Sequence, residues 1–134
     1  MIADQTRVRL VSSRAQTDGA YAALGVTQRA DRGSLGVHLV SCAAQSAPGV
    51  RISLSPEPEG AVYDYNAHGT SALDPLSDRT PDGFPNIAAV ANVPPGSYAL
   101  EARQVDADVL VSRVRSLIRA GAVTYVRLVP SPVP

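Results

Sequence analysis

The first residues that could do chemistry are acidic side chains gathered in one polar stretch of the chain. Asp64 and His68 precede three further aspartates at positions 74, 78 and 82. Carboxylate oxygens at this density can hold Ca²⁺. The spacing fits no defined calcium loop, and solvated turn carboxylates are the alternative. We therefore treat Asp74, Asp78 and Asp82 as candidate metal ligands, and Ca²⁺ as the one cofactor that the sequence suggests.

Tyrosines and arginines form a second group, which could bind a partner without catalysis. Tyr63 and Tyr65 lie two residues apart, so in a strand they share one face. Two exposed tyrosines would make a platform for a carbohydrate or a protein. The chain has one Phe and no Trp, so core packing is the alternative for these rings. Arg113, Arg115 and Arg127 alternate with apolar residues and would line one face of a sheet, either against a partner or in solvent.

Serine, histidine and aspartate are all present, but not in an arrangement typical of an enzyme. His38 lies in a strand-like stretch and His68 in the polar stretch. No Gly-x-Ser-x-Gly motif frames a serine nucleophile. The lone Cys42 excludes an intrachain disulfide and suits a small buried apolar residue. We predict no catalytic residue and no enzymatic activity.

Composition narrows the classes of partner. The 12 basic residues balance 12 acidic ones, so no long-range field gathers nucleic acid or anionic lipid. No apolar run approaches the roughly 18–20 residues of a membrane helix. The start of the chain, residues 1–5, has neither the basic nor the apolar region of a signal peptide. We expect no nucleic-acid partner, no membrane insertion and no signal peptide in this chain.

Turn-forming residues divide the chain into short strands. With 10 Gly and 11 Pro among 134 residues, an all-β fold is favoured over helices. The chain is organised around Pro94-Pro95-Gly96, where Pro95 presets φ and Gly96 is free to take positive φ. Beyond this turn, Tyr98 and Leu100 alternate with polar residues, as in a strand. Further strands are predicted at 6–13, 35–44, 50–55, 61–65, 87–93, 109–118 and 123–129, a hairpin within 14–33 and a long loop over 66–85. The predicted core contains Val50, Ile52, Leu54, Tyr98, Leu100, Val126 and Leu128.

The order of these pieces resembles the carboxypeptidase regulatory-like domain, a transthyretin-like (prealbumin-like) β-sandwich. Residues 47–54, Ala-Pro-Gly-Val-Arg-Ile-Ser-Leu, are similar to the family's turn and its Gly-Val-x-Val-x-Leu strand. Thr-Pro-Asp-Gly-Phe at 80–84 and Val-Pro-Pro-Gly-Ser-Tyr-Ala-Leu at 93–100 are similar to the two motifs that come next. The closing motif is matched at 118–128, and the resemblance covers roughly residues 34–130.

Two features depart from the family pattern. The family's Asp-Gly turn leads at once into a strand, whereas here Phe84 is followed by Pro85 and Asn86, so the strand must start later or bulge. Residues 1–33 have no counterpart. The enzymes that resemble this fold carry motifs that this chain lacks: the Tyr-Arg-Gly-Ser ending of hydroxyisourate hydrolases and the iron-binding His-x-His of intradiol dioxygenases.

The resemblance implies an all-β, antiparallel Greek-key sandwich of about seven strands. We expect an N-terminal strand or hairpin extension at 1–33, the sandwich at 34–130 and a Pro-rich tail at 131–134. The extra strand would pair with its own sheet or with a neighbour's. The implied function is a non-catalytic accessory or adhesion-type module of a secreted or cell-surface protein, which mediates protein binding or spacing. A carbohydrate-binding module is one alternative, and a subunit that self-assembles by strand addition at its edges is the other.

Overall fold

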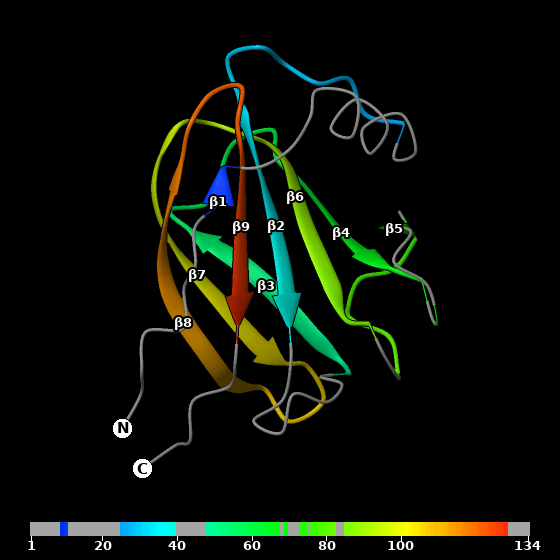
Figure 1. Cartoon of the computed structure of the whole chain (residues 1–134). Coiled ribbons are helices and arrows are strands. Elements are labelled where there is room, and N and C mark those ends of the chain that lie inside the picture. Colours follow the sequence, from blue (N-terminus) through cyan, green and yellow to red (C-terminus); the bar gives the residue numbers. More distant parts are fainter. Residues whose placement is uncertain are drawn as a thin grey trace.

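The computed structural model describes residues 9–10, 25–39, 48–67, 69, 73–74, 76–82 and 85–128 (Figure 1). Predictions that concern Cys42, His68 and the tail at 131–134 lie outside the described residues. Within the described ranges the chain forms strands and no helix. Accordingly, this part of the chain contains no helix with the length and apolar character needed to cross a membrane.

The strands form two sheets that pack face to face (Figure 1). All neighbouring strands are antiparallel except β2 and β9, which are parallel. The structure therefore confirms an all-β fold of two packed sheets. Sheet A has the order β1 (Arg9–Leu10), β9 (Val123–Leu128), β2 (Gly33–Leu39), β6 (Ile87–Val93), β4 (Val62–Asn66) and β5 (Leu73–Asp74). Sheet B has the order β3 (Val50–Ser55), β7 (Gly96–Gln104) and β8 (Val109–Ile118).

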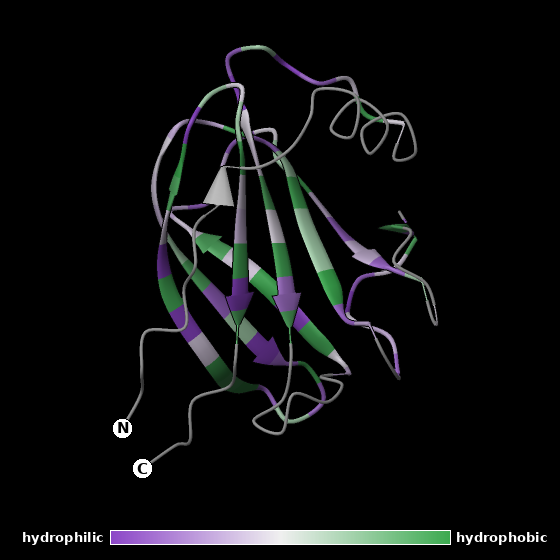
Figure 2. Ribbon diagram, in the orientation of Figure 1, coloured by the Kyte–Doolittle hydropathy of each residue, from purple (hydrophilic) through white to green (hydrophobic). Residues whose placement is uncertain are grey.

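One apolar core lies between the sheets. In β3 the inward residues Val50, Ile52 and Leu54 are buried, whereas the residues between them are exposed. Figure 2 shows the same alternation of apolar and polar residues along most strands. This period of two is what a strand with one buried face requires. All seven predicted core side chains are buried: Val50, Ile52, Leu54, Tyr98, Leu100, Val126 and Leu128.

The Pro-Pro-Gly turn adopts the predicted conformation. Gly96 has a φ of +156°, a region that glycine enters without steric cost. Tyr98, two residues later, donates a hydrogen bond from its hydroxyl to the Pro94 carbonyl over 2.7 Å. The tyrosine therefore ties the start of β7 back to the turn that precedes it.

Two local predictions need correction. The described part of the predicted hairpin, residues 25–32, forms turns and irregular backbone rather than strands. Asn92 holds it: its Oδ1 accepts from the Arg29 amide and its Nδ2 donates to the Thr27 carbonyl. The predicted loop at 66–85 also contains a short strand, β5, which pairs with the end of β4.

The structure bears on two alternatives that the sequence left open at strand ends. The strand after Pro85 starts late, because β6 begins at Ile87. The N-terminal strand lies in its own sheet, since Arg9 and Leu10 pair with Tyr125 and Thr124 of β9. Of the two options for this strand, the structure shows pairing within the chain.

Candidate functional site

One edge of sheet B, strand β3, has its free backbone amides capped by side-chain hydroxyls. The amide of Ile52 donates to the Tyr65 hydroxyl over 2.9 Å, and the amide of Leu54 donates to the Tyr63 hydroxyl over 3.1 Å. At the start of the strand, the Val50 amide donates to Thr80 Oγ1 over 2.9 Å. An edge strand normally presents such amides to any passing strand. On β3 these donors are already used.

The two tyrosines therefore pack inside the molecule, and the predicted platform is corrected. Tyr65 is 2% exposed, and its burial raises the pKa of the phenol to about 12. Burial likewise raises the pKa of Tyr63, which is half-buried against the core. The rings fill the space between β4 of sheet A and β3 of sheet B, so core packing, the alternative reading, is the one that the structure supports. Their hydroxyls, which the spacing argument did not consider, serve the backbone of β3.

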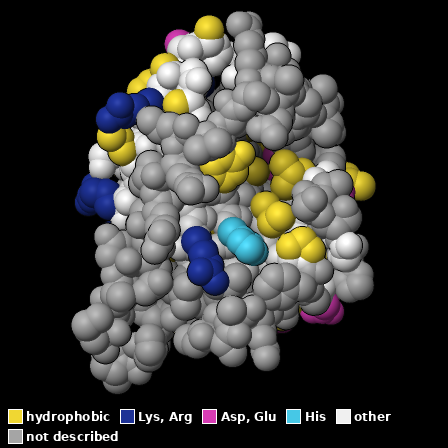
Figure 3. Space-filling model, viewed as in Figure 1, with side chains coloured by type: hydrophobic (Ala, Val, Ile, Leu, Met, Phe, Trp, Pro, Cys, Tyr) yellow, Lys and Arg dark blue, Asp and Glu magenta, His cyan; other side chains and the backbone are white. Residues whose placement is uncertain are grey.

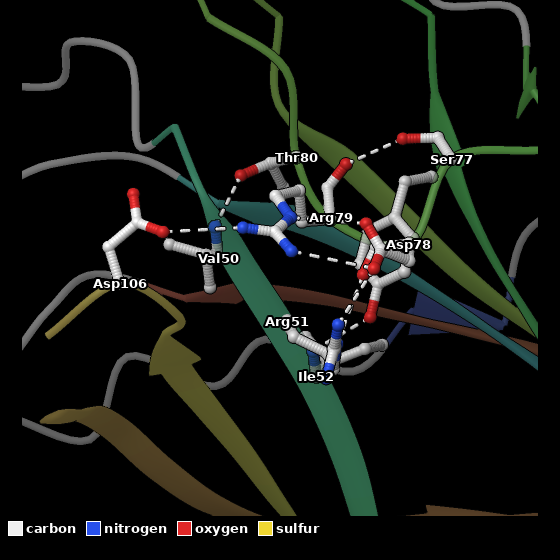
Figure 4. A network of polar contacts seen from close by, with 9 residues as sticks. Val50, Arg51, Ile52, Ser77, Asp78, Arg79, Thr80 and Asp106 are labelled. Atoms are coloured by element: carbon white, nitrogen blue, oxygen red, sulfur yellow. Dashed lines mark hydrogen bonds and ion pairs between the residues drawn. The ribbon is translucent and has the colours of Figure 1, made fainter. Parts of the chain in front are cut away.

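A network of charged side chains covers the start of the same edge (Figure 4). Arg51 contacts Asp78 with 2.8 Å between Nη2 and Oδ2, and Arg79 lies 3.1 Å from the other carboxylate oxygen. Arg79 also lies 3.4 Å from Asp106 Oδ1. The hydrogen bond from Arg79 and the two nearby guanidinium charges lower the pKa of Asp78. The network holds the chain around Thr80 against β3.

These contacts leave the predicted Ca²⁺ ligands in other roles. Asp78 is ion-paired, and Asp74 Oδ1 accepts from the Leu76 amide in a turn. Asp82 is exposed. Asp64 is 2% exposed in β4, where burial raises its pKa. Among the residues that the structure describes, no group of three or more His, Cys, Asp or Glu side chains is placed to hold a metal ion. Within the described residues, Asp74, Asp78 and Asp82 therefore do not come together in one site.

The other edge of sheet B is strand β8, part of whose outward backbone has no partner among the described residues. The hydrogen bonds to the β3 amides show which backbone groups of β8 face outward. Along an antiparallel strand, successive residues direct their N–H and C=O groups to opposite sides. The Leu54 amide points away from β7, so its partner Leu100 directs its backbone toward β8, where it pairs with Val114. The residues on either side, Arg113 and Arg115, consequently direct their N–H and C=O groups away from the sheet.

Nothing in the described part of the chain pairs with that backbone. Strand β8 pairs only with β7 there, and no other described backbone group bonds Arg113 or Arg115. The open stretch ends at Leu117, whose carbonyl accepts a hydrogen bond from Thr124 Oγ1 over 3.1 Å. We call the backbone of residues 113–115 the open edge.

Arginines surround the open edge on the outer face of sheet B. Arg113 lies 3.4 Å from Glu101, which Arg103 approaches at 3.8 Å. Arg115 donates to Ser97 Oγ over 3.3 Å, and no described carboxylate lies within ion-pair distance of it. Figure 3 shows basic side chains along the left rim of the molecule, where Figure 1 places β8. Three arginines, at positions 103, 113 and 115, therefore lie near the single carboxylate of Glu101, and the described part of this face carries excess positive charge.

The structure brings together part of the predicted arginine group and adds to it. Arg113 and Arg115 share the outer face of sheet B, as their alternation predicted. Arg127 does not share it, because β9 belongs to sheet A. Arg51 and Arg103 join the face as cross-strand partners of β3 and β7. Alternation along each strand shows that these two arginines face outward. Only the pairing of the strands shows that they lie on the same face as Arg113 and Arg115.

A shallow hollow lies on the outer face of sheet A. Its volume is about 330 Å³. The Tyr125 ring lies on the backbone of its β2 partner Gly36, where a Cβ would fall 2.9 Å from the ring, and Tyr125 remains 44% exposed. Burial, and then the charge of Arg127, lower the pKa of His38 at the rim. Figure 3 looks onto this face, where a histidine lies beside a basic side chain.

The geometry thus defines two surfaces that could bind: a bare strand edge beside arginines, and a hollow built on a glycine and a tyrosine. A comparison of the chain with models of known protein families, with characterised proteins and with solved structures finds no match.

Proposed function

We propose that this chain is a non-catalytic β-sandwich module that binds a protein partner through sheet B. The observation that carries the proposal is the difference between the two edges of this sheet. Side-chain hydroxyls cap β3, whereas on β8 no described residue bonds the backbone of Arg113 and Arg115, which lies beside a surplus of positive charge. A bare strand edge recognises other polypeptide chains, because its donors and acceptors match theirs.

The proposal includes a finer description of the fold and its setting. We assign the sandwich to the transthyretin-like, Greek-key type of the carboxypeptidase regulatory-like domain. The order of the turn motifs supports this assignment, as does the hydrogen bond of Tyr98 to Pro94 within the central motif. A secreted or cell-surface location rests on the resemblance alone.

The test is to find where selected ligands bind. Peptides selected from a random library on the immobilised protein are titrated into ¹⁵N-labelled protein, and amide shifts are followed by NMR. We expect the shifts to gather on β7 and β8 and to disappear in the double variant Arg113→Ser/Arg115→Ser. The matched control is Arg127→Ser, an exposed arginine on sheet A. Shifts that gather on sheet A, or a library that yields no binder, would refute the proposal.

Carbohydrate binding is a second candidate, and the hollow on sheet A is the observation that favours it. A sugar ring could stack on the exposed part of Tyr125, while Arg127 and His38 at the rim offer polar contacts. An array of glycans would identify a ligand, and Tyr125→Ala should abolish its binding. The control is Val62→Ala, which shortens another exposed side chain of the same sheet. Equal glycan binding by wild type and Tyr125→Ala would exclude this site.

A further inference from the structure

We infer that β8 accepts an extended acidic segment of a partner protein as a fourth strand of sheet B. The inference rests on the proposed function and names the chemistry of its partner. It has three parts: the backbone that is free, the charge beside it, and the apolar surface between the charges.

The backbone of β8 offers complete hydrogen-bonding positions. An added antiparallel strand would place one residue opposite Arg113 and another, two positions on, opposite Arg115. Each of these pairs would exchange hydrogen bonds through the open edge, since both arginines direct N–H and C=O outward. With ten residues, β8 is also the longest strand among those described, so a bound segment has a long template beside it.

The side chains at these positions determine the charge of the partner. Arg113 and Arg115 project from the outer face of the sheet, so the partner residues directly opposite would project from it too. Opposite charges stabilise such cross-strand pairs and like charges destabilise them. Arg113 shares Glu101 with Arg103, and Arg115 contacts the Ser97 hydroxyl and no carboxylate of the described residues, so within that part of the chain both retain unneutralised charge. Acidic residues are therefore favoured at both positions.

The residue between the two arginines determines the character of the intervening partner residue. Val114 points inward and is only half-buried at the rim of the core. A partner residue opposite it would point to the same side and cover its exposed part. An apolar side chain suits that position, because it removes apolar surface from water. The expected recognition pattern is acidic, apolar, acidic.

A second copy of this chain, paired symmetrically about Val114, brings like charges together at the open edge. If two β8 strands paired antiparallel about Val114, Arg113 of one copy would lie opposite Arg115 of the other, and like charges would meet. The β3 edge of another copy is capped by Tyr63, Tyr65 and Thr80. The occupant is therefore a different protein with an acidic strand.

The experiment uses the capped peptide acetyl-Glu-Val-Glu-Val-Glu-amide, whose pattern is the same in both chain directions. Its affinity for the whole chain is measured by NMR titration. We expect Arg113→Ala and Arg115→Ala each to weaken binding about two- to fivefold, as for exposed ion pairs. Arg127→Ala is the matched control and should leave the affinity unchanged.

Methylation of the peptide backbone separates strand addition from simple charge attraction. In the antiparallel complex the glutamate amides would point toward β8, whereas the valine amides would point away. N-methylation of the glutamates should weaken binding about tenfold or more, because it removes several interstrand hydrogen bonds. The isomer methylated on the valines carries the same charge and should bind nearly as well as the unmodified peptide.

Three outcomes would overturn the inference. The first is no binding at millimolar peptide, and the second is equal affinity of the two methylated isomers; in both, the arginines only keep the edge soluble. The third is a wild-type dimer that Arg115→Pro dissociates, which would make a second copy the occupant. The library selection decides the proposed function separately. Selected ligands on β7 and β8 that lack an acidic strand would leave the proposed function standing and refute only this inference.

Discussion

The two edges of sheet B solve the same physical problem in opposite ways. Each edge strand has backbone donors and acceptors that its sheet leaves unpaired. On β3 the chain satisfies the free donors of Val50, Ile52 and Leu54 with hydroxyls from sheet A and from the loop around Thr80. On β8 it supplies arginines, and within the described residues the cap is limited to the Thr124 hydroxyl at the Leu117 carbonyl, beyond the open edge. Within the described residues, the sandwich thus closes one edge of sheet B with its own side chains and leaves part of the other edge without a partner.

The largest effect is expected at the capped edge. Tyr65→Ala removes a buried ring and the acceptor of the Ile52 amide together. We expect it to lower the free energy of unfolding by about 3–5 kcal/mol, the usual range for a large aromatic side chain truncated in a core. Urea denaturation measures the loss, with Tyr125→Ala as the half-exposed control. Similar losses in the two variants would mean that Tyr65 adds nothing beyond ordinary packing at this edge.

Alkaline pH should weaken the capped edge through the same residue. The unfolded chain releases the tyrosine proton near pH 10, whereas Tyr65 in the folded chain keeps it until about 12. The folded state therefore binds more protons in this window, and stability falls as the pH rises from about 10 to about 12, by on the order of 2–3 kcal/mol. The urea midpoint should fall less steeply with pH in Tyr65→Phe. An identical slope in both proteins would contradict the assignment.

A smaller loss is expected when a single cap is removed. Thr80→Val keeps the shape of the side chain but leaves the Val50 amide without its hydroxyl acceptor. The cost of an unsatisfied buried donor is about 1–3 kcal/mol. The Val50 amide should also exchange its hydrogen faster. Thr80→Ser retains the hydroxyl and should preserve slow exchange at Val50; if it exchanges as fast as Thr80→Val, the hydroxyl is not what protects the amide.

The smallest effect is expected at the open edge. Arg115→Ala removes an exposed side chain whose one hydrogen bond among the described residues goes to the Ser97 hydroxyl, so stability should change by no more than about ±0.5 kcal/mol. Amide exchange at Arg113 and Arg115 should already be fast in the wild type, because these amides face outward. Slow exchange at both positions in the isolated chain would show that the edge is covered and would remove the contrast with β3.

Much of the strand pattern follows from local sequence, because each strand with one buried face carries its own alternation. The bounds predicted for β3 and β8 agree with the structure for this reason, and those of β6 agree because a continuous apolar run leads up to the turn. Turn chemistry gave Pro94-Pro95-Gly96 its place, since Pro and Gly restrict or extend φ locally. The short strand β5 was not predicted, because two residues are too few to show the alternation of apolar and polar side chains.

The site was less predictable, because it depends on which strands become edges. Spacing alone put Tyr63 and Tyr65 on one face but did not tell whether that face was inside, nor that their hydroxyls would meet the amides of β3. Alternation identified Arg113 and Arg115, whereas it placed Arg127 on the wrong sheet. The hollow under Tyr125 arises from the parallel pairing with Gly36, a partner nearly ninety positions away (125 − 36 = 89). No local pattern contains that information.

The same parallel pair has a consequence for how the chain folds. Strand β2 lies between β6 and β9, and its parallel partner is the last strand that the structure describes in the chain. During synthesis, the backbone groups of β2 that pair with β9 have no partner until residues 123–128 have left the ribosome. Closing so long a loop before any contact rewards it is slow, which is why folds dominated by non-local pairing fold in milliseconds to seconds. Until β9 arrives, the apolar residues Leu35 and Val37 lie beside an unfinished edge, and this is the interval in which the chain is most exposed to aggregation.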